Sequence, residues 1–348
     1  MSLTRKLLLV LVGIVGLLAL GACTREITTI VQEEPQPSNC FECHSDVDLA
    51  VVRAQTEWAE SRHGEGETVF EGTNASCVRC HANEGFIQFV EDPARLTYTG
   101  STTPTNINCF TCHAPHSSGD FGLRITAPVA LLNGESADVG LSNGCIVCHQ
   151  ARRDVNVYVT ASNNITIRFG PHHGPQGDLL LGTNGYEYDG FDYTNADMAF
   201  HRTSKPEGSR DGEYGCVMCH MIAVNYQVGG HTFKTATVDE ESGDTVYNVD
   251  ACTACHTTYE GEDFDINGVR TEIDGLLAEL QVLLEAAGFV DGTGTPLTVS
   301  GRPADDAGAI WNFMYIGRED RSHGAHNPDY ARALLQSTIN YMNSRAPS

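Results

Sequence analysis

Basic residues are scarce in this 348-residue sequence. It carries 21 Lys and Arg against 45 Asp and Glu, which gives a formal net charge of −24. A protein that binds the phosphates of DNA or RNA needs a basic surface, so this balance excludes nucleic acid as a partner. An acidic surface instead favours basic protein partners or metal cations through electrostatic steering.

Long apolar runs are almost as scarce. The exception runs from Leu7 to Leu20, after Arg5 and Lys6 and directly before two small residues. A short positive region, an apolar stretch and small residues are the form of a cleaved secretory signal. The stretch is too short for a settled membrane span. We therefore predict that residues 1–22 are a signal peptide and that the protein is exported.

The cysteine that follows this signal has its own interpretation. The sequence Leu20–Cys23 resembles a bacterial lipobox, in which cleavage leaves the cysteine as an acylated N-terminus. We predict lipidation of Cys23; the alternative is an ordinary signal with an incidental cysteine. The polar residues 23–38 then form a tether. Because Thr24 stands where inner-membrane lipoproteins carry Asp, analogy favours an outer-membrane lipoprotein that faces the periplasm or the cell surface.

Unpaired cysteines are otherwise missing from the sequence. Of 13 cysteines, all except Cys23 fall into six CxxC pairs, and a histidine directly follows each pair. The six motifs are Cys40, Cys43 and His44; Cys77, Cys80 and His81; Cys109, Cys112 and His113; Cys145, Cys148 and His149; Cys216, Cys219 and His220; and Cys252, Cys255 and His256.

The CxxCH spacing has a direct chemical meaning. Two thiols three residues apart can add to the two vinyl groups at one edge of a haem, and the next residue reaches the iron as an axial ligand. Each motif therefore supplies two thioether bonds and one imidazole. The sequence predicts six covalently bound haem c groups, each containing iron.

Three other uses of cysteine fit less well. Zinc ribbons place two CxxC units close together, whereas these motifs begin 37, 32, 36, 71 and 36 residues apart. A disulfide scaffold suits an exported protein but does not require histidine after each pair. A thioredoxin-like redox motif would not occur six times.

The second axial ligand decides between an electron carrier and a catalyst. Two imidazoles close both faces of the iron and favour electron transfer, and methionine would raise the reduction potential. Eight histidines remain outside the motifs, enough for every iron, and His326 is preferred over His323 because it directly precedes an expected helix. The predicted distal ligands are His63, His116, His172, His173, His201, His231 and His326. The methionine alternatives are Met198, Met218, Met221, Met314 and Met342.

Six haems leave little chain to enclose each one. We therefore expect a mainly irregular and α-helical fold organised by haem, with few short helices and minimal β-structure. Residues 39–260 are predicted to form the hexahaem core, and residues 261–348 a helical C-terminal portion that packs on it.

Local patterns predict individual elements of this fold. Helices are expected over 47–63, 269–287 and 328–343, and in the second of these apolar residues recur at helical spacing. Residues 157–169 alternate in polarity, which predicts a β-hairpin that turns at Asn163 and Asn164.

Four further segments resemble bacterial and archaeal multihaem cytochromes, including those that polymerise into extracellular nanowires and, more distantly, the pentahaem nitrite reductases. The segments are CHAPH (Cys112–His116), PHHGPQGD (Pro171–Asp178), GGHTF (Gly229–Phe233) and the stretch Ala309–Leu335. The resemblance implies a stack of closely packed haems with mostly bis-histidine ligation. In the nanowire branch it also implies ligands lent between subunits.

One departure from this family pattern bears on function. The nitrite reductases bind their catalytic haem through CxxCK, and this sequence has no such motif. We therefore favour a lipid-anchored electron carrier in respiration or extracellular electron transfer over an enzyme. The alternatives are a subunit of a cytochrome filament and a reductase with one open haem. The expected partners are redox proteins, extracellular acceptors, other cytochromes and, for a filament, further copies of this chain.

Overall fold

The computed structural model describes residues 49–114, 122–193, 200–205, 209, 211–222 and 227–345. All of them belong to one compact unit, residues 44–348. The predicted signal peptide and tether lie outside the described residues. So do five predicted site residues, namely Cys23, Cys40, Cys43, His44 and His116.

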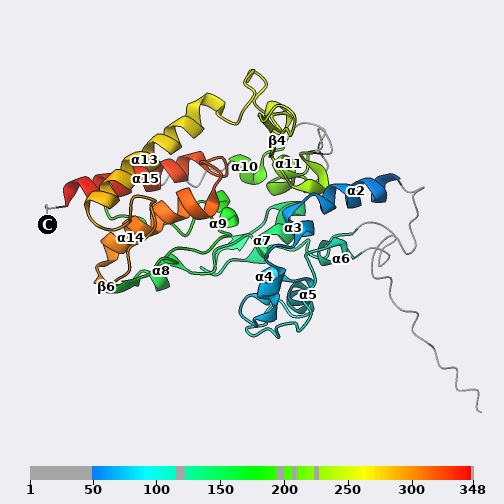
Figure 1. Ribbon diagram of the computed structural model, residues 1–348, viewed down its shortest axis with the longest axis horizontal. Coiled ribbons are helices and arrows are strands. Elements are labelled where there is room, and N and C mark those ends of the chain that lie inside the picture. Colours follow the sequence, from blue (N-terminus) through cyan, green and yellow to red (C-terminus); the bar gives the residue numbers. More distant parts are fainter. Residues whose placement is uncertain are drawn as a thin grey trace, which may run out of the picture. The chain divides into compact units, whose positions relative to one another are not determined.

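Short helices joined by irregular chain dominate the described residues, which confirms the expected fold class (Figure 1). The α-helices are α2 (Leu49–Ala59), α3 (Arg62–Glu65), α4 (Val78–His81), α5 (Asn83–Glu91), α6 (Cys109–Cys112), α7 (Asn143–Ile146), α8 (Val155–Tyr158), α9 (Gln176–Leu181), α10 (Phe200–Thr203), α11 (Cys216–His220), α12 (Asp250–Thr253), α13 (Val269–Ala286), α14 (Ala304–Phe313) and α15 (Pro328–Ser344). The 3₁₀ turns are η2 (Val69–Thr73), η3 (Gly140–Ser142), η4 (Gly230–Thr232) and η5 (Ile266–Gly268), and η6 (Met314–Asp320) is a π-helix.

The β-structure of the described residues consists of three small antiparallel pairs. The strands are β1 (Val129–Ala130) with β2 (Ser136–Ala137), β3 (Asn163–Ile165) with β6 (Val299–Arg302), and β4 (Ala236–Val238) with β5 (Thr245–Tyr247). No helix in the described ranges is long and apolar enough to span a membrane.

The two longest helices, α13 and α15, lie together near the C-terminus, and α14 packs against both of them (Figure 1). Their bounds confirm the helices expected over 269–287 and 328–343. Helix α15 begins where the sequence indicates, because Asn327 accepts a hydrogen bond from the amide of Tyr330 and Pro328 occupies the first turn. The apolar faces of the three helices enclose Leu284, Trp311 and Leu334, all fully buried.

This C-terminal core also takes in residues from the middle of the chain. Val155, Ile165, Phe169 and Leu179 are buried in the same cluster as the three helices. A second cluster forms around Phe86, Phe89, Val129, Leu131, Ala137, Val139, Ile146, Val147 and Leu180. Leu179 and Leu180, adjacent in α9, belong to the C-terminal core and to the second cluster respectively.

The predicted β-hairpin over 157–169 is wrong. Residues 155–158 form α8, and β3 pairs with the distant β6, with Asn163 opposite Arg302. Asn163 does not turn the chain because its buried amide makes other bonds. It accepts from the Thr160 amide at 2.7 Å and donates to the Arg302 carbonyl at 3.0 Å. Ile165 is then free to enter the core.

The helix expected over 47–63 is interrupted. Helix α2 ends at Ala59, and α3 restarts at Arg62 after Ser61, whose hydroxyl accepts a hydrogen bond from the Gly64 amide at 3.0 Å. A serine that bonds to the backbone in this way favours a new helix start over continuation.

Sequence reasoning missed α14 and the π-helix η6 that continues it. Eight of the ten residues of α14 are buried, so the segment lacks the alternation of polar and apolar faces that marks a surface helix. Single π-helical turns are rare and often occur at functional sites. In this chain the π-helix ends at two buried acidic residues, Glu319 and Asp320.

Candidate functional site

The described CxxCH motifs share one local conformation, a single helical turn. The histidine amide donates to the carbonyl of the first cysteine at 3.2 Å in the motif of Cys77, 2.9 Å in those of Cys109 and Cys145, and 2.8 Å in that of Cys252. Residues three and four apart on a helical turn lie on one face. Both thiols and the imidazole of a motif are therefore presented to the same side, as attachment to one porphyrin edge requires.

Four motif histidines lie opposite four of the predicted distal histidines. The ring centres are 6.2 Å apart for His63 and His149, 6.3 Å for His113 and His231, 6.3 Å for His201 and His256, and 6.4 Å for His220 and His326.

These separations match the space that an iron atom needs between two imidazoles. A metal held by one nitrogen on each side at about 2.0 Å puts the ring centres a little over 6 Å apart, since each nitrogen lies about 1.1 Å from its ring centre. The four values span only 6.2 to 6.4 Å. The residues present therefore fit bis-histidine haem.

In five of the predicted ligands, four of them members of these pairs, Nδ1 contacts another group. A metal-bound histidine usually donates its other ring N–H to an acceptor, which fixes the tautomer and the ring orientation. The Nδ1 contacts are His149 with the Gln176 amide oxygen at 3.2 Å, His173 with Glu319 at 2.6 Å, His201 with the Ala325 carbonyl at 2.6 Å, His220 with the Phe233 carbonyl at 2.8 Å, and His326 with Asp320 at 2.6 Å. In each of these residues Nε2 is left for a metal.

Burial keeps several of the paired imidazoles neutral. It lowers the pKa of His63 to about 4 and that of His220 to about 4. Removing a group from water disfavours its charged form. At neutral pH these rings therefore hold the unprotonated form, which is the form that binds a metal.

His81, the remaining described motif histidine, lies near the adjacent pair His172 and His173. Burial lowers the pKa of His81, and the charge of His173 acts in the same direction. The rings of His172 and His173 lie 4.8 Å apart. His172 has a left-handed backbone with a φ of 74°, which lets two successive histidines present their rings together.

His323, the histidine that sequence analysis set aside, lies in a different environment. Its Nδ1 bonds to Asp274 at 2.5 Å, and its side chain is 44% exposed. Within the described part of the chain its ring is not paired with a motif histidine.

Thiols of different motifs touch one another. The Cys80 thiol is hydrogen-bonded to the Cys148 thiol, and the Cys216 thiol is hydrogen-bonded to the Cys145 thiol. These contacts join the motif of Cys77 to that of Cys145, and the motif of Cys145 to that of Cys216.

The fifth motif in turn lies near the sixth. Burial raises the pKa of Cys219 to about 12, and the neighbouring charge of Cys252 acts in the same direction. Cys112 lies close enough to Cys145 and Cys148 to influence both thiols. The described motifs thus form a row, with the motif of Cys109 beside its centre.

Several residues that hold these histidines were missed by sequence reasoning. Gln176, Glu319 and Asp320 contact predicted ligands directly. Glu57 accepts a hydrogen bond from the backbone amide of His231 at 2.9 Å. Residues of these types usually lie on the surface, and only their burial, which a single sequence does not show, marks them.

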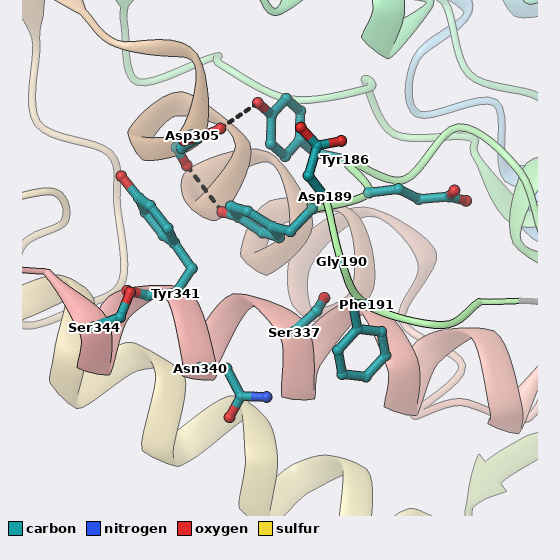
Figure 2. A pocket seen from close by; sticks show the side chains of 11 residues that line it. Tyr186, Asp189, Gly190, Phe191, Asp305, Ser337, Asn340, Tyr341 and Ser344 are labelled. Atoms are coloured by element: carbon teal, nitrogen blue, oxygen red, sulfur yellow. Dashed lines mark hydrogen bonds between the residues drawn. The ribbon is translucent and has the colours of Figure 1, made fainter.

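A pocket of about 440 Å³ lies apart from the motifs, beside α14 and α15 (Figure 2). Tyr186 donates to the Asp305 carboxylate at 2.6 Å, and Tyr188 donates to the Asp305 carbonyl at 2.9 Å. Tyr341 stacks on Tyr188 with ring centres 4.8 Å apart. None of the lining residues belongs to a CxxCH motif or to the predicted distal ligands.

Comparisons with known proteins place these motifs among polyhaem cytochromes. No family model matches the chain. It is 26% identical over 222 residues to the C-type polyheme cytochrome OmcB of Geobacter sulfurreducens, a match that covers 53% of this chain and 29% of that protein. It is also 26% identical over 254 residues to OmcC of the same species, covering 62% and 32%. The chain therefore spans less than a third of the length of these relatives.

A structural comparison adds the undecaheme cytochrome from the S-layer of Carboxydothermus ferrireducens. The TM-score is 0.44 at 19% identity, over 85% of this chain and 40% of that one.

Proposed function

We infer that this chain, a multihaem c-type cytochrome, carries electrons along a connected row of bis-histidine haems. Bound haem supplies a one-electron iron couple at each motif. The observation that carries the inference is the set of four imidazole pairs at 6.2 to 6.4 Å, each combining a motif histidine with a histidine from elsewhere in the chain.

The geometry supports a specific set of axial pairs. His149 is paired with His63, His113 with His231, His256 with His201, and His220 with His326. His173 is assigned to His81, because Glu319 engages only its Nδ1 and its charge lies close enough to His81 to lower the pKa of that imidazole. Of the predicted ligands, His116 and His172 then remain for His44, whose motif completes the six proposed haems.

The contacts between motifs support an order for the haems in the row. Each thiol marks the edge of its porphyrin, so two touching thiols bring two attachment edges together. The row then runs from the motif of Cys77 through that of Cys145 to that of Cys216, and on to that of Cys252. Close edges shorten the distance that an electron crosses between neighbouring irons, which suits a carrier.

Paired imidazoles also support a carrier over an enzyme. A catalytic haem keeps one axial position open for its substrate, whereas two imidazoles close the iron. Each described motif histidine has a histidine as its assigned partner.

The proposed setting is the outside of the inner membrane. The signal sequence and Cys23 support an exported lipoprotein in the outer membrane, with residues 23–38 as its tether. The net charge of −24 supports steering toward basic redox partners, other cytochromes or extracellular acceptors.

Electron paramagnetic resonance of the oxidised protein, with a haem and iron count per chain, tests the proposal. We expect six haems per chain and low-spin ferric signals throughout. A high-spin ferric signal in the intact protein, or carbon monoxide binding after reduction, would show an open iron and contradict the carrier assignment.

A further inference from the structure

We propose that the end of the π-helix η6 sets the relative reduction potentials of three neighbouring haems, with Glu319 and Asp320 lowering the potentials of the haems bound by His173 and His326. The inference rests on the ligand pairs proposed above. It goes beyond them because it assigns an energetic profile to the row.

The two acidic residues are adjacent in sequence and reach different histidines. Glu319 lies 2.6 Å from Nδ1 of His173, and Asp320 lies 2.6 Å from Nδ1 of His326. Successive side chains leave a helix in different directions, so one turn serves two irons. His173 is assigned to the motif of Cys77, and His326 to the motif of Cys216.

Burial makes these carboxylates effective. The Glu319 side chain is 8% exposed and the Asp320 side chain is 0% exposed. A carboxylate that accepts the ring N–H makes the imidazole a stronger donor to iron. A nearby negative charge with little screening also favours Fe(III) over Fe(II). Both effects lower the reduction potential.

Asp320 is held in this position by further contacts. Its second oxygen accepts hydrogen bonds from the amide of Ser322 at 3.0 Å and from the Ser322 hydroxyl. Arg318 and Arg321 flank the acidic pair, but both are exposed and donate to backbone carbonyls, Arg318 to that of Thr293 and Arg321 to that of Arg318 at 2.7 Å. Solvent screens such charges, so they offset little of the buried negative charge.

The haem proposed for the motif of Cys145 lies between these two. Its ligand His149 is linked to the same turn through an uncharged residue, Gln176. Gln176 donates to the carbonyls of Glu319 and Asp320 at 3.1 and 3.3 Å, and its amide oxygen lies 3.2 Å from Nδ1 of His149. The motif of Cys145 touches both neighbouring motifs. We therefore expect a higher potential between two lower ones.

Two further contacts of the proposed ligands differ from those of Glu319 and Asp320. Glu57 lies 3.7 Å from Nδ1 of His231, but it is paired with Arg53 at 2.6 Å. His201 donates to a neutral backbone carbonyl. Glu319 and Asp320 differ from these two contacts because each places a carboxylate 2.6 Å from Nδ1 of a proposed ligand.

Redox titration of the full-length holoprotein, followed by optical and paramagnetic resonance spectra, tests this proposal with Asp320→Asn, Glu319→Gln and Gln176→Glu. Each substitution keeps an acceptor for the imidazole N–H and changes the charge. We expect Asp320→Asn and Glu319→Gln each to favour reduction of one haem, and a different one, by about tenfold, which is 59 mV for one electron. Gln176→Glu should shift a third haem in the opposite direction.

Unchanged potentials in variants that keep every haem low-spin would overturn the role of Glu319 and Asp320 while leaving the carrier function intact. A shift confined to the haem of His149 in Asp320→Asn would overturn the proposed profile as well. An error in the proposed ligand pairs would give a different result. If His326→Ala retains all low-spin signals, His326 is not an axial ligand and the pairing on which this proposal rests is wrong.

Discussion

The imidazole of His63 lies opposite that of His149, with the ring centres 6.2 Å apart and the planes at 65°. The two residues belong to different helical turns, α3 and the turn that follows α7. His63 precedes the motif of Cys77 in the chain, yet it is paired with the motif of Cys145. The proposed axial pairs therefore follow packing rather than sequence order.

Removing His63 should open one iron. We expect His63→Ala to convert one low-spin ferric haem to high-spin and to allow one carbon monoxide to bind per chain after reduction. His323→Ala is the matched control, because His323 bonds to Asp274 and is assigned to no iron. Identical spectra for the two variants would contradict the assignment of His63.

The angle between paired imidazoles predicts the shape of individual resonance signals. The planes are at 75° for His201 and His256 but at 28° for His220 and His326. Steeply crossed imidazoles leave the two iron dπ orbitals nearly equal in energy, which produces a signal with one large g value. Nearly parallel planes separate these orbitals and give a rhombic signal. Low-temperature spectra of His201→Ala should lose large-g intensity, and those of His326→Ala should lose rhombic intensity.

Asp178 should make stability depend on pH. Burial raises the pKa of its carboxyl to about 7, even though the Ala151 amide donates to it at 2.6 Å and the Asn184 amide at 3.1 Å. The folded protein therefore binds a proton more tightly than the unfolded chain does. That stabilisation is complete below about pH 4 and is lost as the pH rises through about 7.

The measurement is guanidinium unfolding of wild type and Asp178→Asn from pH 4.5 to 8. We expect the free energy of unfolding of wild type, relative to the variant, to fall by about 3 kcal/mol between pH 4.5 and pH 8. Asp189→Asn removes an exposed carboxylate from the following loop and controls for net charge. A constant difference between wild type and Asp178→Asn would contradict the buried, proton-binding carboxyl.

The C-terminal helices should depend on their apolar face. Leu284 of α13 is fully buried, whereas Val282 on the same helix is 65% exposed. We expect Leu284→Ala to lower the free energy of unfolding by about 2–5 kcal/mol because it leaves a cavity. Val282→Ala should change it by less than about 0.5 kcal/mol. Circular dichroism during denaturation measures both, and equal effects would contradict the packing of α13.

Covalent chemistry and local pattern account for what could be predicted from the sequence. The CxxCH spacing identifies the thiols and one imidazole of each haem, since attachment depends on residues within a single helical turn. The apolar spacing of α13 and the Asn327 and Pro328 pair before α15 likewise act locally. The alternating pattern over residues 157–169 predicted a hairpin that does not form. The partner strand of Asn163 lies at residues 299–302, which no local pattern indicates.

The sequence alone determined that this protein carries haem and holds enough histidines to close each iron. Only the tertiary structure decided which histidine faces which motif, because the two imidazoles of a pair come from separate segments of an irregular chain. It also decided that Glu319, Asp320 and Gln176 lie behind three of those imidazoles. Burial gives these common polar residues their effect, and burial is a property of the folded chain.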